Sequence, residues 1–260
     1  MVTLTFGIMT FCTLAAFVAG FIDSIAGGGG LITIPALMLS GIPPQFALGT
    51  NKVQACTGTM VSVFLFARGK FIVWRIAILG LPFALAGSGL GSSLALSLDS
   101  AVLGKILLAL LPCAMCLTLV QPKSAENVSA TPLTGPRFWI LTPLVSLVIG
   151  AYDGFFGPGT GCFFILAFHW LLKRGLVEAS ATTKVLNLAS NFSAMVIFIT
   201  SDVVLWPLAL SMLAASVAGN WLGARTAMRI GTKAVRFFLT IALILLMATL
   251  LWRYVIAPAS

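Results

Sequence analysis

Ten predominantly apolar segments follow one another along the chain, separated by short polar or glycine-rich stretches. Most of them are long enough to cross the hydrocarbon core of a bilayer as a helix, which takes about 20 residues. Two, 31–41 and 160–172, are too short to span comfortably, and each follows a glycine-rich loop. The pattern predicts an all-α polytopic membrane protein with about 8–10 hydrophobic helices, some of them short or re-entrant. The expected segments are 4–22, 31–41, 46–67, 72–97, 101–120, 138–153, 160–172, 178–200, 203–224 and 233–256.

The second half of the chain repeats the first. The stretch GFIDSIAGGGG at 20–30 recurs as GAYDGFFGPGTG at 150–161, and TNKV at 50–53 recurs as TTKV at 182–185. The two short apolar segments occupy matching positions after the two glycine loops. In transporters built from internal repeats, short and Gly/Pro-interrupted segments at matching positions point to the binding site, which lies between the halves.

The charges in the loops indicate how the chain is oriented in the membrane and how its two halves are oriented relative to each other. Loop 68–75 is basic, whereas its repeat-mate 201–207 carries only Asp202, so equivalent loops lie on opposite faces of the bilayer. Five segments per half, an odd number, require the same inversion. The sequence therefore predicts two inverted-topology halves, 1–128 and 129–260, related by a two-fold axis in the membrane plane. The positive-inside tendency places both termini outside the cytoplasm. The basic loops on the cytoplasmic side are 68–75, 121–137, 173–178 and 225–236.

Composition excludes several classes of protein. The chain is 60% hydrophobic and 8% charged, far too few charged residues for the surface of a soluble domain, so its surface must face lipid. The net charge of +9 resides mainly in short loops, which favours membrane orientation over nucleic-acid binding. With a single histidine, most metal sites and intramembrane enzymes are disfavoured. We expect a lipid bilayer and a small anion as partners, no nucleic acid and no cofactor.

Four charged residues lie inside apolar segments and match across the repeat. Lys52 and Lys184 stand away from the basic loops, where a charge needs a cavity or a partner to face. Either both cations converge on an anionic substrate, or each pairs with an aspartate and holds the fold. Asp23 and Asp153 each precede a glycine loop. They are candidates for capping the following helix, for pairing with a lysine or for carrying a proton.

The glycine loops and the polar residues near the lysines complete the candidate site. Bare backbone N–H groups at the start of a helix bind anions without any basic side chain, although close helix packing explains the glycines equally well. Leu186 replaces Gln54 in the second half, so we expect one half to dominate binding. Besides the lysines, the candidate substrate-binding residues are Thr50, Asn51, Gln54, Thr183, Asn187, Gly27, Gly28, Gly29, Gly30, Gly157, Gly159 and Gly161.

The stretch GFIDSIAGGGGLITIPALMLSGIPPQFALGTNKVQACTGT at 20–59 resembles the TauE/SafE sulfite-exporter family, also called the TSUP permeases, and in particular its YfcA-like membrane transporters. The second copy, with GAYDGFFGPGTG and TTKVLNLASN, resembles the second half of that family. The resemblance implies a multi-pass permease of the bacterial cytoplasmic (inner) membrane. It also implies sulfite, sulfonates or other small sulfur-containing anions as substrates.

The sequence thus predicts a transporter that exposes a central anion site to each side of the membrane in turn. Coupling to protons and assembly into a homodimer are both open at this stage. A passive anion channel is the alternative, because glycine loops and lysines can also line a pore.

Overall fold

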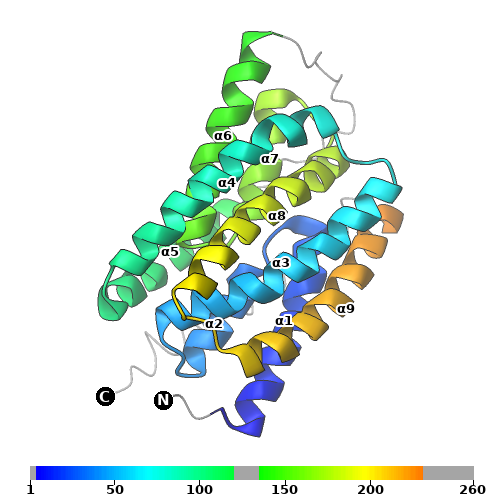
Figure 1. Ribbon diagram of the computed structural model, residues 1–260. Coiled ribbons are helices and arrows are strands. Elements are labelled where there is room, and N and C mark those ends of the chain that lie inside the picture. The colour runs from blue at the N-terminus through cyan, green and yellow to red at the C-terminus, as the bar shows by residue number, and fades with distance from the viewer. Residues whose placement is uncertain (1–3, 120–134, 231–260) are drawn as a thin grey trace.

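The computed structural model describes residues 4–119 and 135–230, and within these ranges every regular element is helical (Figure 1). Nine of the ten predicted segments form helices close to their expected bounds. The tenth, 233–256, lies outside the described residues. The helices are α1 (Phe6–Ala26), α2 (Gly30–Leu39), α3 (Pro44–Arg68), α4 (Trp74–Ser97), α5 (Ser100–Leu119), α6 (Pro136–Phe155), α7 (Thr160–Leu172), α8 (Leu176–Thr200) and α9 (Trp206–Ile230).

The lengths of the helices fit a protein that crosses a bilayer many times. Five helices, α1, α4, α6, α8 and α9, are long and apolar enough to span a membrane. As predicted, α2 and α7 are short, with 10 and 13 residues. Large apolar side chains such as Phe6, Leu90 and Trp139 are exposed on the outside of the bundle, which suits contact with lipid rather than water. The prediction of an all-α polytopic membrane protein is confirmed.

Each repeat half contributes helices to two interleaved groups. Helix α1 packs along α9, and in the matching arrangement α6 packs along α4. Helix α3 packs against α9 and α8 against α4, while α3 and α8 contact each other at the centre (Figure 1). Each of these contacts of the first half thus has a counterpart in the second, as a two-fold relation requires. Helix α9 of the second half packs in one group with α1, α2 and α3, and helix α4 of the first half packs in the other group with α6, α7 and α8. The two halves of the chain are therefore intertwined.

Small residues allow the paired helices to approach closely. A Cβ atom added to Gly219 or Gly223 of α9 would collide with the backbone of α1. A Cβ atom added to Gly87 or Gly91 of α4 would collide in the same way with the backbone of α6. These positions match across the repeat, and the small-xxx-small spacing predicts this kind of packing in membranes.

Two threonines accept hydrogen bonds from backbone N–H groups at the starts of α9 and α4. The Thr50 hydroxyl of α3 accepts a hydrogen bond from the Leu205 N–H at 3.1 Å, immediately before α9. The Thr182 hydroxyl of α8 accepts one from the Val73 N–H at 2.9 Å, immediately before α4. The first N–H groups of a helix have no partner within the helix, so these hydroxyls satisfy groups that would otherwise remain unpaired.

Candidate functional site

The two glycine loops touch where the halves meet. Helix α1 ends at Gly27, whose φ of 75° favours glycine. A Cβ atom on Gly27 would lie 2.5 Å from the Cα atom of Gly161 in the first turn of α7. The Cys162 N–H donates to the Gly27 carbonyl at 3.0 Å, and the Cys162 thiol donates to the Ala26 carbonyl at 3.0 Å. The loops therefore meet backbone to backbone.

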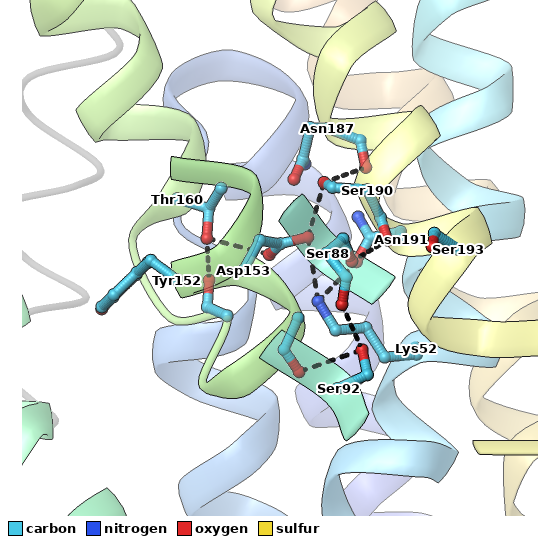
Figure 2. Close-up of polar contacts among 12 residues, drawn as sticks. Lys52, Ser88, Ser92, Tyr152, Asp153, Thr160, Asn187, Ser190, Asn191 and Ser193 are labelled. Carbon is cyan, nitrogen blue, oxygen red and sulfur yellow. Dashed lines mark hydrogen bonds and ion pairs between the residues drawn. The ribbon is translucent and has the colours of Figure 1, made fainter. Parts of the chain in front are cut away.

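Lys52 of α3 forms a buried ion pair with Asp153 of α6. The Lys52 Nζ atom lies 3.0 Å from Asp153 Oδ2 and donates to Asn191 Oδ1 at 3.0 Å (Figure 2). The Asp153 carboxylate also accepts from the Ser190 hydroxyl at 2.6 Å and from the Thr160 hydroxyl at 2.8 Å. The two charged side chains are only 1% and 3% exposed, so this pair is enclosed and well hydrogen-bonded.

Lys184 of α8 forms the matching pair with Asp23 of α1. The Lys184 Nζ atom lies 2.9 Å from Asp23 Oδ2 and also donates to the Asp23 backbone carbonyl. The Asp23 carboxylate accepts from the Gly29 N–H at 3.2 Å, immediately before α2. Asp23 therefore pairs with a lysine and also accepts from a backbone N–H just before α2, while its capping role stays a prediction. The Asp23 side chain is 16% exposed and, within residues 4–119 and 135–230, has no hydroxyl donors like those around Asp153, so the second pair is more open than the first.

Both pairs join the first half of the chain to the second. In each pair the lysine comes from one half and the aspartate from the other, and the two positive and two negative charges cancel. A charge buried without its partner costs several kcal/mol, so the pairs stabilise the contact between the halves. The interpretation that each lysine pairs with an aspartate is confirmed. Substrate binding by the lysines is a separate question.

A cavity lined mainly by glycines and polar side chains lies between the glycine loops and helices α1, α3, α8 and α9. Together with the open space at its mouth it measures about 440 Å³. Most of the predicted site residues line it, including every predicted glycine and both aspartates. Helices α2 and α7 begin at Gly30 and Thr160 in its wall, so the positive ends of both helix dipoles face the cavity. The predicted residues in the wall are Asp23, Gly27, Gly28, Gly29, Gly30, Asn51, Lys52, Gln54, Asp153, Gly157, Gly159, Gly161 and Asn187.

Three predicted site residues do not line the cavity. Lys184 is fully buried against Asp23, and the Thr50 hydroxyl accepts from the Leu205 N–H near the start of α9. Thr183 is buried, and its hydroxyl has no hydrogen-bond partner in the part of the chain that the structure describes. Substrate binding by these three stays a prediction, and the geometry gives it no support.

Sequence reasoning missed polar residues that α9 contributes to the cavity. Ser216 and Asn220 lie in the wall, and the Asn220 side chain donates to the Ser216 carbonyl and accepts from Ser62. The available signal was their spacing of four residues in an apolar segment, which places both on one face of a helix. Among the described residues, no group of three or more His, Cys, Asp or Glu side chains could hold a metal ion.

A family model described as sulfite exporter TauE/SafE matches residues 12–250. The chain belongs to the sulfite exporter TauE/SafE family. A probable membrane transporter protein of Haemophilus influenzae is 41% identical over 226 residues, which is 87% of each chain. The probable membrane transporter protein ORF9 of Sinorhizobium sp. is 41% identical over 251 residues, covering 95% of this chain and 94% of the relative. The probable membrane transporter protein YfcA of Escherichia coli (strain K12) is 38% identical over 237 residues, covering 91% and 87%. No solved structure matches the chain significantly.

Membership of the TauE/SafE family identifies the chain as a multi-pass membrane protein of a bacterial transporter family. The two stretches that carry the resemblance supply the glycine loops and the lysine-bearing helices. In this TauE/SafE protein those elements form the cavity wall and both ion pairs. These two stretches therefore converge on one place in the fold.

Proposed function

We propose that this protein is a carrier that moves a small anion across the bacterial cytoplasmic membrane by alternating access. The sulfur oxyanion named in the family description, sulfite, and related sulfonates are the proposed substrates. The observation that carries the proposal is the pair of cross-half Lys–Asp contacts beside a polar cavity at the junction of two matching halves. Carriers built from inverted repeats place their substrate sites at such a junction.

Several groups in the cavity wall favour an anion. Lys52 supplies a positive charge, and the positive ends of the α2 and α7 helix dipoles lie in the cavity wall. The Asn187 amide lies in the wall, is 5% exposed and has no side-chain hydrogen bond among the described residues, so its N–H groups are available to an oxyanion. Neutral donors at fixed positions bind oxyanions without adding net charge to a low-dielectric site.

Charge balance supports coupling to protons. The four charges of the two pairs sum to zero, so a bound monoanion leaves the site with a net charge of −1. Uptake of one proton restores neutrality, and an uncompensated charge at membrane depth is costly. Asp23 is the proposed proton acceptor because it faces the cavity, is more exposed than Asp153 and has fewer donors. The charged groups around it are its partner Lys184 and, elsewhere in the site, Lys52 and Asp153.

Flux into proteoliposomes tests the proposed function. Sulfite, sulfoacetate, taurine and sulfate are each offered with and without a proton gradient. We expect saturable flux of at least one sulfur anion that increases with an inward proton gradient, because the cavity accommodates a limited number of molecules in each cycle. Rapid, unsaturable leak would contradict a carrier and favour the channel alternative, and absence of all flux would contradict the proposed substrate class.

Asp23→Asn is expected to separate anion exchange from proton coupling. The amide keeps an oxygen for the Gly29 N–H and for Lys184 but cannot carry a proton. Anion exchange at equal pH should persist, while stimulation by the gradient should fall to the level of a control without one. Asp202→Asn, at an exposed position after α8, is the matched control and should retain stimulation. Undiminished stimulation in Asp23→Asn would remove Asp23 from the coupling step.

A further inference from the structure

Gln54 of α3 places a buried hydrogen-bond acceptor beside the cavity. The side chain lies in the cavity wall and is 3% exposed. Its Nε2 atom donates to Asn51 Oδ1 at 2.8 Å, whereas its Oε1 atom is buried and has no partner among the described residues. Buried acceptors are normally hydrogen-bonded, so we expect a bound ligand to donate a hydrogen bond to this oxygen.

The hydrogen bonds of Asn51 determine which atom of the Gln54 amide is left without a partner. Asn51 Oδ1 accepts from both Gln54 and Thr33, which leaves the Gln54 carbonyl oxygen without a donor among the described residues. Both residues lie in the cavity wall.

The charges nearby reinforce the requirement for a donor. The wall contains two carboxylates, Asp23 and Asp153, as well as the amide oxygen. A ligand whose surface consists only of negative oxygens meets repulsion from each of these acceptors. The second half has Leu186 in place of Gln54, so only one side of the site carries this acceptor. A ligand that is both anionic and hydrogen-donating satisfies the lysine, the amide N–H groups and this oxygen together.

We propose that Gln54 selects anions that carry a hydrogen-bond donor over anions that carry none. Hydrogensulfite, sulfamate and hydroxysulfonates belong to the favoured class, whereas fully deprotonated sulfite and simple alkylsulfonates do not. The inference rests on the proposed function, since it concerns the specificity of the same cavity. A binding site whose buried acceptor hydrogen-bonds a donor on the ligand binds the analogue lacking that donor more weakly, because the acceptor then remains unpaired.

Sulfamate and methanesulfonate test this selection directly. The two monoanions have nearly the same size and differ in that an amino group replaces a methyl group. Isothermal titration of the purified full chain in detergent measures the binding of each. We expect sulfamate to bind roughly tenfold more tightly to the wild type, as one hydrogen bond to a buried acceptor implies. In Gln54→Leu, which copies Leu186, the preference should vanish or reverse.

Two comparisons keep the test decisive. Gln54→Met retains the length of the side chain without its acceptor, so it replaces Gln54→Leu if that variant melts at a much lower temperature. Equal affinities in the wild type, absence of binding by both anions, or a sulfamate preference that survives in both variants would overturn the proposal. Titration reports binding even if proteoliposomes show no flux, so failure of the proposed function is recognised separately.

Discussion

Lys52→Met is expected to abolish anion flux and to lower the free energy of unfolding by about 3–5 kcal/mol. The substitution removes the cation that lies 3.0 Å from Asp153 Oδ2 and leaves that carboxylate 3% exposed without its counter-ion. The hydroxyls of Ser190 and Thr160 still donate to it, but they do not neutralise its charge. Unfolding in detergent measures the stability, and sulfite uptake by proteoliposomes measures the flux.

The double variant Lys52→Met/Asp153→Asn separates folding from transport. Removing both charges together eliminates the unpaired carboxylate, and the Asn oxygen still accepts from Ser190. We expect most of the lost stability to return, as happens when a buried pair is replaced as a unit. Flux should remain absent because the cavity has lost its cation. Restored flux would show that the pair only holds the fold, which is the alternative that the sequence left open.

Lys184→Met/Asp23→Asn is the matched variant of the other pair. Lys184 does not line the cavity, so its loss leaves the cation of Lys52 in the wall. We expect this variant to fold and to retain anion exchange at equal pH without stimulation by a proton gradient. Equal loss of exchange in both double variants would contradict the unequal roles assigned to the two pairs.

The sequence was sufficient to find the charged residues but not to assign their partners. The repeat singled out Lys52, Lys184, Asp23 and Asp153, and their positions in apolar segments required neutralisation. Pairing within one half and pairing between halves satisfy that requirement equally well. Helix α4 packs with helices of the second half, and α9 packs with helices of the first. This tertiary arrangement brings α3 against elements of the second half. No local pattern encodes it.

The dependence on tertiary contacts also explains which neutral residues were correctly predicted to line the cavity. Asn51 and Gln54 lie within one turn of Lys52, so any arrangement that turns Lys52 inward brings them toward the same cavity. Thr50 also lies close to Lys52, yet its hydroxyl accepts from the Leu205 N–H, a group 155 positions away in the chain. Asn220 is the opposite case, because it lines the cavity although the sequence analysis did not name it. It reaches the cavity from α9, a helix in which the sequence analysis named no site residue, because the contact between α9 and α3 cannot be read from spacing.

Gly161→Ala is expected to destabilise the protein by about 3 kcal/mol and to abolish flux. Alanine in a helix is intrinsically favoured over glycine by about 1 kcal/mol, so propensity alone predicts a gain in stability. A Cβ atom at this position would collide with the Cα and carbonyl atoms of Gly27, which are backbone and cannot rotate away. Overpacking against backbone costs more than the propensity returns.

Gly175→Ala is the matched control, because a Cβ atom there would meet no atom within 4 Å. Its melting temperature in detergent should stay within about 2 °C of the wild type, since a free surface position contributes little. If Gly161→Ala melted at or above the wild-type temperature, the glycine loops would have room between them and the contact of Gly27 with Gly161 would not restrict packing. If it folded and retained flux, the loops would move apart during transport rather than stay in contact. The expected loss of both properties follows from a junction where the two halves meet through backbone atoms, with the Lys–Asp pairs beside it.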